Sequence, residues 1–108
     1  MYLVAIGGLR IRNAFHAPEF YWRASHTLAQ ARGADGCLHA SVFRKAEGLF
    51  SLTAWQSPAE MKRYAHSGAH ARILKVAPRL AVIYHFHHYR CDGVPDAQDA
   101  YDRWKSVR

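Results

Sequence analysis

The sequence predicts an α+β domain whose elements follow the order β-α-β-β-α-β, with one further helix at the C-terminal end. Three observations indicate this order. Short apolar runs rich in β-branched and aromatic residues alternate with segments whose apolar residues recur every three or four positions. Gly, Pro, Asp and Ser mark the joints between these segments. The chain has 108 residues, and we expect residues 1–108 to form a single domain.

The first part of the chain predicts a strand followed by a helix. Residues 2–12 form a Leu-, Val- and Ile-rich run, and Gly7-Gly8 within it indicates a bulge or a close backbone approach. After a connector, Pro18 suits the first turn of a helix, and Gly33 predicts its end. The apolar residues between them repeat with a period near 3.6, namely Phe20, Ala24, Leu28 and Ala31.

The middle of the chain predicts a hairpin and then a helix with a break. Residues 37–43 and 49–55 read as two strands joined by a loop over residues 45–48. Ser57, Pro58 and Glu60 then form a capping box with Pro at the first helical position. Ser67-Gly68 interrupts this helix, and Ser67 can cap a second segment that runs to about Ala77 and stops at Pro78.

The last part predicts a strand over residues 80–90 and a C-terminal helical extension over residues 95–107. The docking face of that helix should contain Ala97, Ala100, Tyr101 and Trp104. The element order is the ferredoxin-like split βαβ pattern, in which both helices cover one face of an antiparallel sheet. We expect a second copy of the chain to cover the other face, so that a homodimer encloses a barrel-like space.

Composition narrows the class of protein. Half of the residues are apolar and 13% are aromatic, as in a globular domain. No apolar run approaches the roughly 20 residues that span a membrane, and residues 1–6 lack the basic start of a signal peptide, so we expect a cytoplasmic protein. The fifteen Lys and Arg residues behind the net charge of +7 are scattered, so we expect no nucleic-acid partner. Cys37 and Cys91 are expected to be reduced thiols.

The segment from Trp55 to His70 reads W-x-S-P-A-E-M-x-x-Y-x-x-S-G-A-H. It resembles antibiotic-biosynthesis-monooxygenase-like proteins of the dimeric α/β-barrel superfamily, and within them the branch related to spheroidene monooxygenase. The element order extends this resemblance over residues 2–90. The superfamily includes cofactor-independent quinone-forming monooxygenases, haem-degrading monooxygenases, dye-decolourising peroxidases and proteins with no known reaction, so the resemblance implies a fold more than a reaction.

Two departures from the family pattern argue against the haem-degrading branch in particular. Gly7 and Gly8 stand where that branch has an Asn on the first strand, and His70 lies in a different helical setting from its histidine. We therefore expect no cofactor, with haem or a His-bound metal as the less favoured alternative.

His70 is the candidate catalytic residue. It falls in the first turn of the segment that Ser67 can cap, where free N–H groups and the helix dipole favour a neutral imidazole that can act as donor or base. The alternative is that His70 only closes the cap by bonding back to Ser67. Trp55, at the end of its strand, either lines the same cavity or belongs to the core. No activated nucleophile and no phosphate-binding loop is present.

His85 and His87 are further candidate ligand-binding residues. On a strand they share a face, and such an H-x-H pair can bind a metal if His39 or His70 supplies a third ligand. The alternative is a pair of ordinary polar strand residues. Ala81 and Ile83 should share their face, which we expect to line the barrel interior. The bulkier opposite set should pack under the helices, namely Val82, Tyr84, Phe86 and His88.

Two functions of different classes follow. The resemblance implies a monooxygenase-like enzyme that binds a hydrophobic small molecule in a barrel cavity and oxygenates it without a cofactor. In that reaction His70 would remove a proton from an electron-rich substrate, and the carbanion would react with dioxygen. The alternative is a non-catalytic small-molecule-binding protein or a purely structural dimeric barrel. The residues expected to contact the ligand are Trp55, Ser67, His70, His85 and His87.

Overall fold

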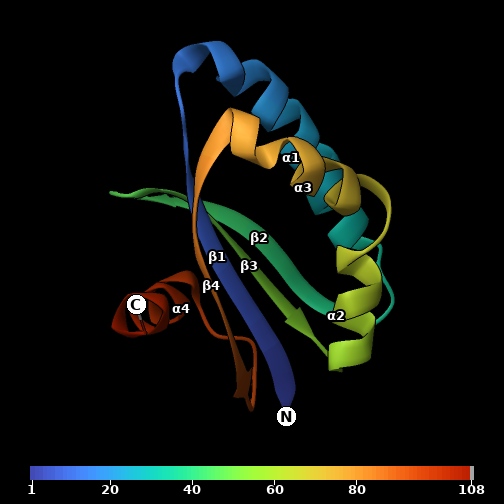
Figure 1. Ribbon diagram of the computed structural model, residues 1–108. Coiled ribbons are helices and arrows are strands. Elements are labelled where there is room, and N and C mark those ends of the chain that lie inside the picture. Colours follow the sequence, from blue (N-terminus) through green and yellow to red (C-terminus); the bar gives the residue numbers. More distant parts are fainter. Residues whose placement is uncertain (108) are drawn as a thin grey trace.

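A computed structural model describes residues 1–107 and shows one four-stranded antiparallel sheet with helices on both faces (Figure 1). The strands are β1 (Tyr2–Ile11), β2 (Cys37–Lys45), β3 (Gly48–Trp55) and β4 (Ala81–Cys91), arranged in the order β2-β3-β1-β4. Helices α1 (Ala17–Arg32), α2 (Pro58–Ala65) and α3 (Gly68–Leu80) lie on one face, and α4 (Ala97–Ser106) lies on the other. The predicted α+β ferredoxin-like fold with a C-terminal helix is confirmed.

The helix boundaries follow the predicted signals, with one difference. The backbone N–H of Glu60 donates to Ser57 Oγ over 3.4 Å, and the Ser57 hydroxyl donates to the Glu60 carboxylate over 2.9 Å. α3 continues past Pro78 to Leu80, three residues beyond the expected end at Ala77. The proline has no N–H to donate to the carbonyl of Leu74, and Leu74 lies on the exposed side of the helix.

α4 packs its apolar side onto the face of the sheet that points away from the other helices. Ala100, Tyr101 and Trp104 join a buried cluster with six sheet residues, namely Val4, Ile6, Phe50, Leu52, Ala54 and Tyr89. The Phe50 ring meets Trp104 edge-on, with ring centroids 4.7 Å apart. The chain therefore covers this face with its own α4, and the expectation that a second copy covers it is wrong. The homodimer as such stays a prediction.

A β-bulge in β4 changes which residues share a face. Leu9 pairs with Ile83 and Gly7 pairs with Phe86, so a two-residue step on β1 opposes a three-residue step on β4. Tyr84 and His85, the two residues inside that step, both lie against Trp104 of α4.

The bulge overturns part of the predicted face pattern. Ile83 and Phe86 lie on the face that carries α1–α3, because they pair with Leu9 and Gly7, whose side of β1 is that of Leu3. The expectation that Ala81 and Ile83 share a face with His85 is wrong. Val82 and Tyr84 lie on the α4 side, opposite to the face predicted for them.

Two further expectations concern the whole chain. Cys37 and Cys91 are free thiols, and strands β3 and β1 lie between the two strands that carry them. Within residues 1–107, no helix is long and apolar enough to cross a membrane.

Candidate functional site

The sheet face under α1 and α3 is open to solvent in its middle. One row of paired residues crosses the middle of this face, from β2 to β4: Val42, Ser51, Gly7 and Phe86. Phe86 is 57% exposed, Val42 is 46% exposed, and Ser51 is exposed although β3 is an inner strand of the sheet.

The exposed row lies between two buried ends of the same face. At one end Leu3 pairs with Trp55 and both are buried, and at the other Leu80 and Ala81 are buried where α3 meets β4. Figure 1 shows α1 and α3 arching over the sheet between these two ends. The opposite face of β3 is closed, since Phe50 and Leu52 are each 1% exposed. Solvent therefore reaches the middle row of this face, and we call the open region between the two buried ends the cleft.

The absence of a side chain at Gly7 leaves room for the ring of Phe86 in the middle row. A Cβ added to Gly7 would stand 2.1 Å from the ring of Phe86, so the ring occupies the space that a side chain would need. The predicted close approach at Gly7-Gly8 is thus present, and Gly8 makes the equivalent approach to Phe50 on the other face. Ser51 and its strand neighbour Thr53 add hydroxyl groups to the cleft side of β3.

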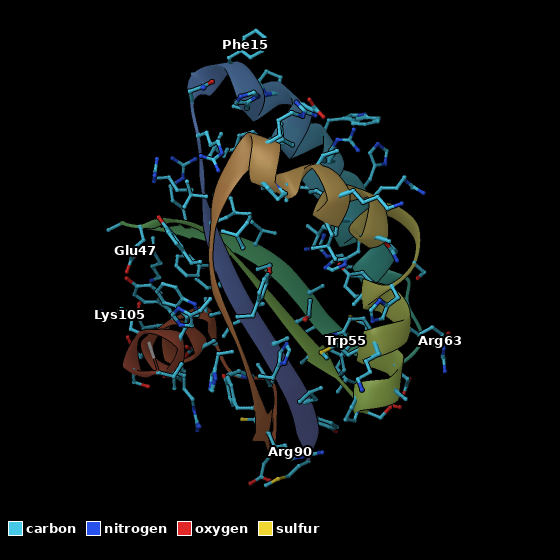
Figure 2. All side chains as sticks on the ribbon, in the orientation of Figure 1. Phe15, Glu47, Trp55, Arg63, Arg90 and Lys105 are labelled. Carbon is cyan, nitrogen blue, oxygen red and sulfur yellow. The ribbon has the colours of Figure 1, made fainter. Side chains whose placement is uncertain are left out.

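Three rings are in contact where the end of β3 meets α2 and α3. Trp55 is fully buried between the end of β3 and α2 (Figure 2), and its ring centroid lies 5.1 Å from that of Tyr64. The Tyr64 ring in turn lies 4.7 Å from the ring of His70. Burial raises the pKa of Tyr64, so its phenol stays protonated at neutral pH. The Nε1 atom of Trp55 has no hydrogen-bond partner within the described residues, although it is a buried donor.

His70 is held as a neutral imidazole with one nitrogen open. Its Nδ1 atom lies 3.0 Å from the backbone carbonyl of Ala65. A carbonyl only accepts, so Nδ1 carries the hydrogen and Nε2 carries the lone pair. Burial lowers the pKa of His70, which keeps the ring neutral, and the bond to Ala65 opposes this shift. Across residues 1–107, no hydrogen bond engages Nε2. The alternative in which the ring bonds back to Ser67 is wrong.

The start of α3 is capped by a residue that the sequence pattern does not reveal. Ser67 occupies the N-cap position, but its hydroxyl donates to the carbonyl of Arg63 in the preceding helix, 2.7 Å away. The expected cap by Ser67 is therefore wrong. Gln30 of α1 takes this role, since its Oε1 atom accepts from the backbone N–H of His70 over 2.8 Å. Gln30 lies 40 positions from His70, and no local motif links them.

His85 and His87 lie on the other face of the sheet. The Nε2 atom of His85 is 3.0 Å from the carbonyl of Trp104, and the Trp104 indole donates to the carbonyl of His85 over 2.8 Å. The two rings stack with centroids 4.4 Å apart. His87 pairs with buried Ile6, and its ring stacks on Tyr89. Both histidines face away from α1–α3, as expected, and α4 covers His85 there.

The five expected ligand contacts therefore divide into two groups. Trp55, Ser67 and His70 gather on the helix side, whereas the sheet separates them from His85 and His87. His88, not His87, shares the cleft side of β4 with Phe86. The sequence pattern placed His88 there but gave it no role.

Within residues 1–107, the H-x-H pair has no third ligand close by. His39 lies on β2, and strands β3 and β1 separate it from β4, a distance of about 14 Å at the usual strand spacing. The Nε2 atom of His39 lies 2.9 Å from the hydroxyl of Ser41. Within the part of the chain that the structure describes, no three His, Cys, Asp or Glu side chains are grouped to hold a metal ion.

Comparison with solved structures shows which proteins share this fold. SnoaB, a cofactor-independent oxygenase from Streptomyces nogalater, has a TM-score of 0.70 with 12% identity, covering 88% of this chain and 98% of its own. A candidate antibiotic biosynthesis monooxygenase from Deinococcus radiodurans has a TM-score of 0.71 with 19% identity, covering 87% and 96%. A conserved protein from Methanosarcina mazei has a TM-score of 0.73 with 14% identity, covering 83% and 92%.

These identities show the fold alone. The chain has the fold of antibiotic-biosynthesis-monooxygenase-like proteins, which confirms the structural part of the resemblance seen in residues 55–70. The likeness to the spheroidene monooxygenase branch is not confirmed. No family model matches the chain, and no curated protein matches it in sequence.

Proposed function

We propose that this protein is a monooxygenase-like enzyme that binds a hydrophobic aromatic molecule in the cleft and oxygenates it without a cofactor. The observation that carries the proposal is His70, a neutral imidazole with an open Nε2 beside the ring of Tyr64. The shared fold with a cofactor-independent oxygenase supports it. The exposed middle row of the sheet face supports it too, because its side chains are apolar or carry a hydroxyl group and none is charged.

The reaction assigns a defined task to His70. Nε2 accepts a proton from an acidic C–H or O–H of an electron-rich substrate, which leaves a delocalised carbanion. The carbanion gives its electrons to dioxygen, and a C–O bond forms as a hydroperoxide. The proton held by His70 completes the hydroperoxide. Loss of water then converts the reacting carbon, with the hydrogen that it still carries, to C=O, so one oxygen atom stays on the product and the other leaves as water. The unpartnered Trp55 N–H is a donor that a substrate oxygen can satisfy.

Oxygen uptake with a panel of hydroquinones and polyphenols tests the proposal. We expect turnover by the unmodified protein and a loss of about 10²-fold or more in His70→Ala, the usual contribution of a positioned base. His66→Ala is the matched control, because His66 is exposed at the end of α2. Full turnover in His70→Ala would remove His70 from the mechanism.

The alternative function is a non-catalytic small-molecule-binding protein, and the same open Nε2 supports it as a hydrogen-bond acceptor. Quenching of tryptophan fluorescence by a polyphenol, without oxygen uptake, would identify this function. A homodimer and a cytoplasmic location stay predictions. Light scattering at micromolar concentration tests the homodimer, and with α4 docked on the sheet it requires another contact surface or a movement of α4.

A further inference from the structure

Gln30 of α1 makes a three-part contact at the break between α2 and α3. Its amide nitrogen donates to the carbonyl of Ser67 over 2.8 Å and to the carbonyl of Tyr64 over 3.3 Å. Its amide oxygen accepts from the backbone N–H of His70 over 2.8 Å. One side chain therefore bonds the last turn of α2, the residue at the break and the first turn of α3.

Gly68 gives the break between α2 and α3 its shape, and it lies next to the side chain of Gln30. Gly68 has a φ of +59°, which residues with a Cβ rarely adopt. A Cβ at Gly68 would also stand 3.1 Å from the carboxamide carbon of Gln30. The glycine thus allows the chain to turn and gives Gln30 access to the backbone on both sides of the turn.

The break also creates the bond that fixes the His70 ring. Had α2 continued, the carbonyl of Ala65 would accept a backbone N–H from the next turn. Because α2 ends at Ala65, this carbonyl is open, and the Nδ1–H of His70 donates to it. Gln30 holds His70 through its backbone, and Ala65 holds it through its ring.

We propose that Gln30 is a positioning residue for His70. Its carboxamide holds the α2–α3 break in the geometry that keeps Nδ1 of His70 bonded to Ala65 and leaves Nε2 open toward a ligand. The link to catalysis rests on the proposed function, but the position and the tautomer of His70 are properties of the ligand-free protein.

Histidine NMR of the ligand-free, isotope-labelled protein tests this inference without any substrate. In the unmodified protein we expect His70 to show a single neutral tautomer with the hydrogen on Nδ1. In Gln30→Ala we expect a mixed population rich in the Nε2–H form, which predominates for an imidazole without fixed partners. The exposed residues His26 and His66 serve as internal references. Gln56→Ala, at an exposed position between β3 and α2, is the matched control and should leave His70 unchanged.

If Gln30→Ala does not fold, Gln30→Glu provides a second test of the inference. Its carboxylate still accepts from the backbone N–H of His70, but it cannot donate to Ser67 or Tyr64. The titratable groups nearest His70 are Tyr64 and His66, and neither is negative at neutral pH. The new charge should therefore raise the pKa of His70, which an NMR titration measures.

A folded Gln30→Ala protein whose His70 keeps the Nδ1–H tautomer would overturn the inference, as would an unchanged His70 pKa in Gln30→Glu. A changed tautomer together with an unmodified protein that consumes no oxygen would refute the proposed function and leave the positioning role intact.

Discussion

At the scale of single residues, the candidate site depends on hydrogen bonds that fix a neutral imidazole. Among the described residues, His70 has no carboxylate partner of the kind that orients the histidine of a catalytic triad. Its ring is oriented by a backbone carbonyl, and burial lowers its pKa. Such an imidazole is a base at neutral pH without first having to lose a proton. The buried indole of Trp55 adds a donor that the protein alone leaves unpaired.

The lowered pKa of His70 predicts a pH-dependent stability. The unfolded chain binds a proton near pH 6.5, whereas the folded chain does so only at lower pH, so acid favours the unfolded state. This contribution is fully present above pH 6.5 and is lost as the pH falls toward the folded pKa. Urea unfolding between pH 5 and 8 measures it, and His70→Gln should show a shallower decline on the acid side.

His87 does not confuse that comparison, because it is present in both proteins and its pKa is also lowered by burial. Parallel stability curves for the unmodified protein and His70→Gln would show that the folded protein does not disfavour protonation of His70.

At the scale of elements, the break between α2 and α3 is the feature that places His70. Two helices on one face of a ferredoxin-like sheet normally need no such break, and here it brings Gln30, Ser67 and His70 together. Glu19 joins the start of α1 to the end of α3, because its carboxylate accepts hydrogen bonds from Arg79. It also accepts one from Arg23 within α1. These bonds to Arg79 and Arg23 lower the pKa of Glu19 to about 2. Polar contacts therefore join α1 to the end of α3 through Glu19 and to the α2–α3 break through Gln30.

Gly68→Ala should disturb the break specifically. The backbone there is left-handed, which costs a residue with a Cβ about 1–2 kcal/mol, and the new methyl group presses on Gln30. We expect a loss of about that size in the free energy of unfolding, together with lower activity if His70 is the base. Gly93→Ala is the control, since a Cβ there meets nothing within 4 Å. Equal behaviour of the two variants would contradict this account of the break.

The elements were predictable where local chemistry determines them. The capping box at Ser57 and the break at Ser67-Gly68 were read from the sequence, and Ala100, Tyr101 and Trp104 do face the sheet. The faces of β4 were not predictable, because alternation holds only until a bulge, and nothing in the letters around Tyr84 marks one.

The three-part contact made by Gln30 was not predicted, for a different reason. It joins Gln30 to residues that are 34 to 40 positions away, so only the packing of α1 against the α2–α3 break creates it. The cleft was missed likewise, because Ser51 has the pattern of a strand residue and only the arch of the helices leaves it exposed.

At the scale of the whole molecule, the two faces of the sheet do different work. The α4 side is filled by aromatic and aliphatic side chains that stabilise the fold. The α1–α3 side is filled only at its ends and keeps an exposed middle row. A short domain can leave one face open in this way because α4 supplies a buried core on the other.

Trp104 should therefore matter far more than its distance from the cleft suggests. It is 2% exposed, stacks on His85 and meets Phe50, so Trp104→Ala should lower the free energy of unfolding by about 3–5 kcal/mol. Loosening of α4 should also uncover the apolar sheet face, and light scattering should then show a mass that rises with concentration. Trp22→Ala, at a 61% exposed position on α1, is the matched control and should change stability by less than about 0.5 kcal/mol. Similar unfolding curves for the two variants would mean that α4 does not form the core described for it.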